Sequence, residues 1–388
     1  MADVEIGIGK TGRRAYGFDD IAIVPSRRTR DPEDVSLAWE IDAYRFDLPL
    51  VASAMDGVVS PTTAIEIGRL GGLAVLNLEG LWTRYDDPEP LLDEIASLPA
   101  EQATARMQEI YAKPIEADLI TARVKQVRDS GVTVAASLTP QRTVQFAQTV
   151  LDSGVDLFVI QGTVVSAEHV SSRSEPLNLK RFISDLDVPV LVGGCATYQS
   201  ALHLMRTGAA GILVGVGPGQ ANTTRGVLGL GVPMATSIAD AAGARRDYLD
   251  ESGGRYVHVI ADGGMRTGGD VAKAIACGAD AVMMGAPLAR ALEAPGRGRH
   301  WSMETTHGEL PRGTRVRTSP VGTLKEVLVG PAAVDDGSMN IMGSLRASMA
   351  ATGYSTLKEF QKVDVMVAPS ITTEGKGLQR AQGVGPLG

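Results

Sequence analysis

The sequence predicts a single (β/α)8 barrel, and two observations lead to this prediction. First, eight short apolar runs rich in Val, Ile, Leu and Ala recur along the 388 residues, at 48–52, 73–77, 133–138, 157–161, 188–192, 211–215, 256–261 and 281–285. They lack a clean polar alternation, as expected for parallel strands covered on both faces. Second, a helix-ending glycine phrase precedes five of them, as in Cys277-Gly278-Ala279-Asp280. Eight strand–helix units fit this α/β barrel best, with a doubly wound open sheet as the alternative.

Three intervals depart from the ordinary strand–helix unit. Residues 100–129 predict additional helix because Glu, Arg, Ala, Ile and Lys recur at helical spacing, and residues 237–249 predict a helix after a glycine-rich loop. Residues 294–321 are rich in Gly, Pro, Arg and His without periodicity, which is typical of a flap beside a barrel mouth. We therefore expect one domain over 1–388, with a barrel core at about 48–293, this flap, short terminal extensions and a loose tail at 363–388.

Composition narrows the class of protein. The net charge of -8 argues against a broad surface for nucleic acid or anionic membrane, although a local anion pocket is compatible with it. Two cysteines, Cys195 and Cys277, are too few for a disulfide framework and fit a reducing cytoplasm. We find neither a run of 18 apolar residues nor a signal-peptide pattern. The expectation is a cytoplasmic protein without nucleic-acid or membrane partners.

Chemistry in such barrels is concentrated where the strands end. The residues that follow the predicted strands are Ser53-Ala54-Met55-Asp56, Asn77, Gln161-Gly162, Gly193-Gly194-Cys195, 215–219, Asp262-Gly263-Gly264 and Gly285-Ala286. Glycine turns after the seventh and eighth strands predict a phosphate site made by backbone N–H groups, or simply tight turns. Asp262 fits a ligand for ribose hydroxyls, with an ordinary helix cap as the alternative.

Several longer stretches carry a resemblance that covers nearly the whole chain. They are 16–25, 53–56 with 71–72, the loop Gly-Val-Gly-Pro-Gly-Gln-Ala-Asn-Thr-Thr-Arg at 215–225, and 260–264, 282–285 and 294–296. In this order they resemble the IMP dehydrogenase/GMP reductase family. The pair of CBS domains that many IMP dehydrogenases insert after the second strand is absent, so the chain resembles the short branch of the family.

The resemblance implies a specific chemistry. In the family, a cysteine thiolate attacks C2 of a purine nucleotide, and hydride then moves between C2 and a nicotinamide cofactor. The thiolate is used because it is both a good nucleophile and a good leaving group. By resemblance we expect IMP, GMP or XMP as ligand, NAD or NADP as cofactor, and a homotetramer. The carbonyls of Gly217, Gly219 and Asn222 form a possible monovalent-cation site, and no other metal is expected.

The resemblance also assigns residues, and several of them depart from the family. Catalytic positions are Asn222, where the family has its cysteine, and the retained Thr224; an amide cannot form the covalent adduct. Nucleotide positions are Ser53, Met55, Gln220, Asp262, Gly263, Gly264, Gly285, Ala286, His300, Met303 and Arg312, and cofactor positions are Gln161, Gly215 and Gly217. Gln220 and Ala286 replace phosphate-contacting serines, and His300 replaces a tyrosine. Arg312 replaces a purine-binding Glu or Gln, and Gln161 replaces an aspartate near the nicotinamide ribose.

Two features leave alternatives open. Cys195 is either a relocated nucleophile facing the barrel mouth or a small buried residue at a strand end. The flap arginines place a guanidinium over a phosphate, form a solvated surface, or make a subunit contact; they are Arg297, Arg299, Arg312, Arg315 and Arg317. Two functions follow: a purine-nucleotide oxidoreductase with an altered mechanism, or a catalytically inactive nucleotide-binding, regulatory or structural relative that partners a catalytic sibling.

Overall fold

The closed barrel predicted from the sequence is confirmed. The structure, a computed structural model, describes residues 3–170, 177–368 and 374–386. Its eight parallel strands are β6 (Leu50–Ala52), β7 (Leu73–Asn77), β8 (Ala135–Leu138), β9 (Leu157–Gln161), β10 (Val190–Cys195), β11 (Gly211–Val214), β12 (His258–Asp262) and β13 (Ala281–Met284). Neighbours in sequence pair in this order, and β13 closes the barrel on β6, with Met283 opposite Val51. The alternative of an open sheet is therefore wrong.

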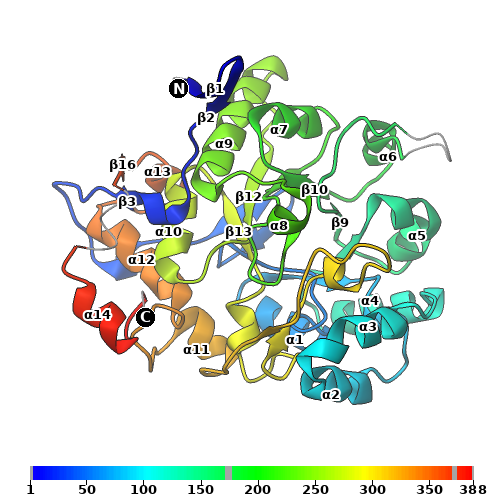
Figure 1. Cartoon of the computed structure of the whole chain (residues 1–388). Coiled ribbons are helices and arrows are strands. Elements are labelled where there is room, and N and C mark those ends of the chain that lie inside the picture. Colours follow the sequence, from blue (N-terminus) through cyan, green and yellow to red (C-terminus); the bar gives the residue numbers. More distant parts are fainter. Residues whose placement is uncertain (1–2, 171–176, 369–373, 387–388) are drawn as a thin grey trace.

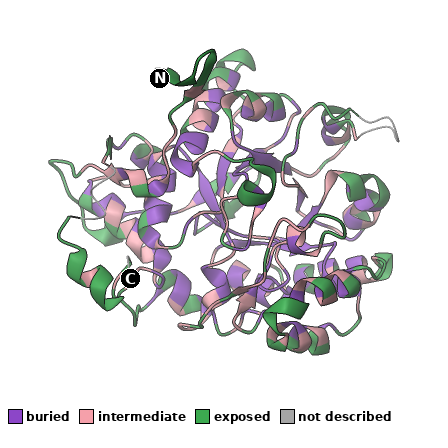
Figure 2. Cartoon of the chain, viewed as in Figure 1, coloured by how far each residue is buried: buried purple, intermediate pink, exposed green. Residues whose placement is uncertain are grey.

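Helices surround this barrel (Figure 1). The helices that alternate with the strands are α1 (Pro61–Arg69), α4 (Ala117–Arg128), α5 (Pro140–Asp152), α6 (Leu179–Ser184), α7 (Tyr198–Met205), α9 (Met234–Glu251) and α10 (Gly268–Ala276). Their starts follow local chemistry: the Ser60 side chain accepts the Thr63 N–H, and Pro61 supplies the first helical residue without an orphan donor. Strands and inward helix faces are buried, whereas the outer helix faces are exposed (Figure 2). The helix predicted at 237–249 is α9, which is longer at both ends.

Strand β10 runs three residues beyond the predicted 188–192. The extension contains Gly193 and Gly194, which periodicity treats as a turn. A side chain at Gly193 would collide with the carbonyl of Leu213 on the neighbouring strand. The glycines therefore serve close packing of β10 against β11, and they carry Cys195 into the strand rather than onto a loop.

The additional helix predicted at 100–129 is two helices, α3 (Ala100–Tyr111) and α4, interrupted around Pro114, which has no N–H to donate. Helix α4 packs against α1 and α5 as a member of the barrel ring. Helix α3 instead joins α2 (Glu89–Ser97) and η3 (Leu81–Thr83) in a separate apolar cluster, which includes Trp301 of the flap. The sequence pattern did not separate the inserted helix from the barrel helix, because both are amphipathic with the same period.

The C-terminal stretch is more ordered than the loose tail predicted at 363–388. Strand β16 (Val365–Val367) pairs antiparallel with β3 (Ile21–Ile23), and α14 (Gly377–Gln382) follows. Residues 369–373 and 387–388 of that tail lie outside the described residues.

Further elements outside the barrel are β1 (Asp3–Gly7), β2 (Lys10–Arg13), η1 (Phe18–Asp20), η2 (Pro32–Asp34), β4 (Trp39–Ile41), β5 (Tyr44–Phe46), η4 (Leu288–Arg290), α11 (Leu324–Val329), α12 (Ile341–Ala351) and α13 (Leu357–Phe360). Among the described helices, none combines the length and apolar character required to cross a bilayer.

Candidate active site

A cavity of about 370 Å³ opens at the carboxyl ends of the barrel strands. Its lining brings together most of the residues that the sequence nominated: Ser53, Met55, Gln161, Gly215, Gly217, Gly219, Gln220, Asn222, Asp262, Gly263, Gly264, Gly285, Ala286, His300 and Met303. Three nominated residues, Thr224, Cys195 and Arg312, do not line it. Residues from the ends of five strands, the loop that follows β11 and the flap thus converge on one space, as expected for the mouth of a barrel.

The 215–223 loop places Asn222 at the cavity. A side chain at Gly215 would collide with the Asp262 carbonyl, so the loop can pass close to β12 only with glycine there. Asn222 then turns its carboxamide toward the chain: Oδ1 accepts the N–H of Thr224 at 2.8 Å, where α8 (Thr224–Leu228) begins. The Gly219 carbonyl nominated for a cation accepts the Asn222 N–H at 3.0 Å. Asn222 therefore orders the loop, and no thiol lines the cavity.

Cys195 does not face the barrel mouth as expected. Its residue is 2% exposed, and its Sγ donates to the carbonyl of Leu213 at 3.6 Å. Burial raises the pKa of the thiol to about 12, which leaves the thiol protonated and a poor nucleophile at neutral pH. The structure thus favours the interpretation of Cys195 as a buried packing residue.

Asp262 is the last residue of β12 and is hydrogen-bonded within the cavity. Gln161, at the end of β9, donates its Nε2 to Asp262 Oδ2 at 2.9 Å. Burial raises the pKa of Asp262 to about 7, the negative charge of Glu304 adds to the rise, and the Gln161 bond opposes it. The alternative of a helix cap is wrong, because Thr267 caps α10. The carboxyl is poised to gain or lose a proton near neutral pH.

Glu304 was missed by sequence reasoning as a site residue. It lies in the flap, in η5 (Met303–Thr306), and lines the cavity. The Thr163 hydroxyl donates to its Oε1 at 2.7 Å, and Arg312 in turn donates from Nη2 to Thr163 Oγ1 at 3.4 Å. The flap has no periodicity from which side-chain directions can be read, so neither Glu304 nor the position of Arg312 beside Thr163 was foreseeable.

The turns after β12 and β13 need glycine for different reasons. Gly263 and Gly264 have φ values of 80° and 81°, which disfavour other residues, and both lie against Pro218. A side chain at Gly285 would collide with the sulfur of Met55. Beside these turns Arg266 lines the cavity, although its Nη2 also donates to Asp19 at 3.3 Å. It is the one arginine that lines the cavity among the residues that the structure describes, and the sequence did not point to it.

Several buried polar atoms around the mouth have no hydrogen-bond partner in the described chain. His300, in β14 (Arg299–His300), lines the cavity with both ring nitrogens unpaired, and burial lowers the pKa of its imidazole to about 4. The hydroxyls of Thr224 and Thr305 and Nε of Arg312 are also buried without a partner, but these residues do not line the cavity. Buried polar groups are nearly always hydrogen-bonded in folded proteins. The imidazole of His300 therefore keeps hydrogen-bonding capacity for a polar ligand in the cavity.

The flap arginines are engaged mainly away from the cavity. Arg297 pairs with Glu89 and Asp93 on α2, and Arg315 donates to the carbonyls of Ile95 and Leu98 at the end of that helix. Arg299 donates to the Ala96 carbonyl at 3.3 Å. Arg317 lies on β15 (Val316–Arg317), paired with β14. None of the five arginines lines the cavity, so the hypothesis of a guanidinium over the phosphate is not supported.

A buried chain of hydrogen bonds also joins the flap to the inserted helices. The indole N–H of Trp301 donates to the Tyr111 hydroxyl at 2.8 Å, and that hydroxyl donates to the Asp56 carboxylate. Asp56 follows β6, and burial raises its pKa to about 6 despite these donors. The flap is thereby fixed to α3 and to the barrel rim at once.

No group of three or more His, Cys, Asp or Glu side chains is placed to bind a metal ion in the described part of the chain.

Comparison with known proteins agrees with this architecture. The family model of the IMP dehydrogenase / GMP reductase domain matches residues 15–309, well over half of the chain. The chain belongs to this family. An uncharacterized oxidoreductase of Mycolicibacterium smegmatis is 53% identical over 372 residues, covering 94% of this chain and 99% of that protein. An uncharacterized oxidoreductase of Mycobacterium tuberculosis strain H37Rv is 54% identical over 373 residues, again with 94% and 99% coverage.

Two further similar proteins are a named enzyme and a protein of known structure. The inosine-5'-monophosphate dehydrogenase of Methanocaldococcus jannaschii is 27% identical, with 92% of this chain and 94% of that protein covered. The crystal structure of an IMP dehydrogenase/GMP reductase-like protein from Corynebacterium glutamicum superposes with a TM-score of 0.90 at 49% identity, covering 94% of this chain and 97% of that one. The roles of individual site residues stay predictions.

Proposed function

We propose that this member of the family binds a purine ribonucleotide at the barrel mouth and acts on it as a nicotinamide-linked oxidoreductase without a covalent cysteine adduct. The observation that carries the proposal is the cavity itself. It gathers most of the positions that the resemblance assigns to nucleotide and cofactor, its described lining includes the buried His300 with two unpaired ring nitrogens, and neither Cys195 nor Cys277 is among the lining residues. A nucleotide supplies the acceptors and donors that such groups lack.

The same residues define how nucleotide and cofactor are held in the proposal. The turns at Gly264 and Gly285 contribute backbone N–H groups toward a phosphate, whereas the Gly263 N–H is donated to the Met283 carbonyl, and Asp262 accepts from ribose hydroxyls. Gln161 and the backbone of Gly215 and Gly217 hold the cofactor. These residues suit a nicotinamide cofactor because they are polar or glycine and line the cavity. A bound nicotinamide would accept or supply the hydride.

Proton transfer falls to the carboxylates of the cavity. In the described part of the chain, the two carboxylates that line the cavity are Asp262 and Glu304, and the pKa of Asp262 near 7 allows it to exchange a proton at neutral pH. Addition of water to C2 of the purine forms a C–O bond, shifts the C2–N3 π pair to N3, and releases a proton. In this proposal the carboxylate pair accepts that proton, so that no enzyme-bound adduct is needed.

Calorimetric titration with IMP, GMP and XMP, each with and without NAD or NADP, tests the binding step. Absorbance of the nicotinamide at the same substrates over a pH series tests turnover. Selective binding with turnover supports the proposal. Binding without any absorbance change overturns the oxidoreductase, and no binding at all overturns the nucleotide site as well.

A second candidate, a catalytically inactive nucleotide-binding relative, is favoured by one observation. Asn222 stands at the cysteine position with its amide bonded to Thr224, and the Cys195 thiol is buried and turned toward Leu213. This candidate predicts that Asn222→Cys alone gives no turnover, because Gln220 and Ala286 still replace the phosphate-contacting serines. Robust activity of that single variant would contradict it.

Both candidates predict weak binding of the nucleotide phosphate. Three of the flap arginines, Arg297, Arg299 and Arg315, are bonded to α2 and the residue that ends it, and each missing hydrogen bond to a charged group typically costs about 1.5–3 kcal/mol. We expect the dissociation constant of IMP to be above the micromolar range, measured by calorimetry. A submicromolar value would show that Arg266 and the backbone turns suffice.

A further inference from the structure

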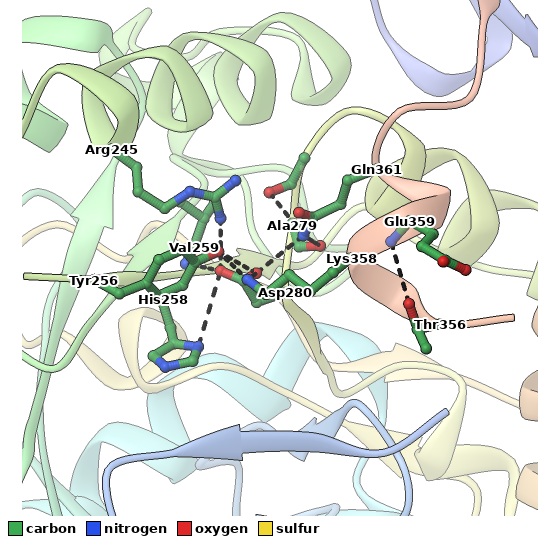
Figure 3. A network of polar contacts seen from close by, with 11 residues as sticks. Arg245, Tyr256, His258, Val259, Ala279, Asp280, Thr356, Lys358, Glu359 and Gln361 are labelled. Atoms are coloured by element: carbon green, nitrogen blue, oxygen red, sulfur yellow. Dashed lines mark hydrogen bonds and ion pairs between the residues drawn. The ribbon is translucent and has the colours of Figure 1, made fainter. Parts of the chain in front are cut away.

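A second polar cluster lies at the opposite end of the barrel, around Asp280, which directly precedes β13. Its carboxylate is buried, with 3% side-chain exposure, and accepts five hydrogen bonds. Oδ2 accepts from Arg245 Nη1 at 2.7 Å and from the Val259 N–H at 2.8 Å. Oδ1 accepts from the hydroxyl of Tyr256 at 2.7 Å, Nζ of Lys358 at 2.6 Å and Nε2 of Gln361 at 2.9 Å. Figure 3 shows these donors converging on one carboxylate from α9, from β12 and the residues before it, and from α13 and its C-terminal end.

The cluster carries more positive than negative charge. One carboxylate faces two cations, Arg245 and Lys358, which lie on the Tyr256 ring at 5.0 and 3.7 Å from its centroid. Burial lowers the pKa of Lys358, and the charge of Arg245 lowers it further, while Asp280 opposes both. His258 adds no charge at neutral pH, because burial lowers the pKa of its imidazole to about 4. One positive charge of the pair is therefore left without compensation.

A cavity of about 300 Å³ is lined by Arg245, Tyr256 and Lys358 of this positively charged cluster. Among the described residues, four cations line it, Arg245, Arg246, Lys358 and Lys362, together with Tyr256, Leu249, Glu359 and Gln361. Glu359 is the one carboxylate among these residues; it accepts the N–H and the hydroxyl of Ser355 at 3.1 and 2.7 Å and keeps its negative charge, so that with Asp280 two negative charges face four positive ones. Arg245 has 9% side-chain exposure and is fixed by Asp280, so part of the positive wall is rigid.

We propose that this cavity at the amino-terminal end of the barrel is a binding site for a phosphate-bearing anion. Arginine forks and lysine ammonium groups bind phosphate oxygens through charge-assisted hydrogen bonds. With Asp280 and Glu359 counted, the four cations leave an excess of two positive charges, which a phosphate or diphosphate can match and a single carboxylate cannot. The Tyr256 ring is occupied by Arg245 and Lys358, so the site recognises the charged group and offers no free aromatic face to a base. Its residues are separate from those of the barrel mouth.

Calorimetric titration of the whole chain with inorganic pyrophosphate at constant ionic strength tests the site. The informative variant is Arg246→Gln with Lys362→Gln, because neither side chain bonds to Asp280 and the folded cluster is left intact. We expect it to weaken pyrophosphate binding about tenfold or more. The matched control, Arg27→Gln with Lys180→Gln, removes the same charge from exposed positions and should bind as the unmodified chain does.

The variant Arg266→Gln distinguishes binding at the barrel mouth from binding at the cavity beside Asp280. It removes an arginine that lines the mouth and should leave pyrophosphate affinity unchanged. Loss of binding in Arg266→Gln but not in the Arg246/Lys362 variant overturns the proposal. So does an absence of binding in the unmodified chain up to about 10 mM, where the affinity is too weak for a specific site. A comparison with a nucleoside diphosphate identifies the source: tighter binding than pyrophosphate assigns a phosphorylated metabolite, and weaker binding assigns the free anion.

Discussion

Asp262 and Asp280 lie at opposite ends of the same two neighbouring strands, and their surroundings are electrostatically opposite. Asp280 receives two cations and three neutral donors, which hold the pKa of its carboxyl at about 2 although burial alone would raise it. Asp262 receives one amide donor and faces Glu304, and its pKa rises to about 7. The difference teaches that a buried carboxylate is structural where its hydrogen bonds are complete and chemically available where they are not.

The largest effect on the free energy of unfolding is expected from removing the charge of Asp280, at the amino-terminal end of the barrel. Asp280→Asn leaves the buried Arg245 and the partly exposed Lys358 without their counterion, which should lower the free energy of unfolding by about 3–5 kcal/mol in urea titration at pH 7, mainly through Arg245. The control Asp240→Asn breaks the more exposed pair with Arg13 and should cost about 1 kcal/mol or less. Equal losses in the two variants would contradict the contrast.

The difference in the free energy of unfolding between the unmodified chain and Asp280→Asn should decrease in acid. Because the folded pKa of Asp280 lies below its unfolded value, its contribution to stability is complete above about pH 4 and is lost as pH falls through about 2. The gap in stability between the unmodified chain and Asp280→Asn should therefore narrow in this acid range.

A smaller effect of opposite sign is expected at the mouth. The folded pKa of Asp262 lies above its unfolded value, so ionisation costs stability as pH rises from about 4 through 7. Asp262→Asn should thus be more stable than the unmodified chain at pH 8, by roughly 1–3 kcal/mol in urea titration, and equally stable near pH 4. Under the proposed function, the same variant loses nucleotide affinity. A destabilised variant at pH 8 would mean that the carboxylate is structural after all.

The smallest effect concerns the carboxylate pair itself. Glu304→Gln removes the charge that raises the pKa of Asp262 but keeps an amide oxygen for the Thr163 hydroxyl. We expect the pKa of Asp262 to fall, measured from the carboxyl carbon shift by NMR. Glu309→Gln, on the exposed part of the flap, is the matched control and should leave that pKa unchanged. An unchanged pKa in both variants would show that Glu304 does not interact with Asp262.

The contrast also explains how far sequence reasoning reached. Strand ends and the glycine turns at Gly263 and Gly285 were predictable, because barrel periodicity and positive φ leave marks in the sequence. Asn222 was found by resemblance. Glu304 and Arg266 were not found, since flap and turn residues have no periodicity from which to infer direction. Cys195 was expected at the mouth because two glycines imitate a turn, whereas close strand packing requires them inside β10.

The anchoring of the flap has a mechanical consequence. Arg297, Arg299 and Arg315 are bonded to α2 and the residue that ends it, Trp301 is buried against α3, and Gln108 of α3 donates to the His307 carbonyl at 2.8 Å. A loop tied along its length to two helices cannot swing as a free lid. Opening the mouth wide would require α2, α3 and the flap to move together as one rigid unit. Access to the cavity is therefore governed by the packing of α2 and α3, which contribute none of the described residues that line it.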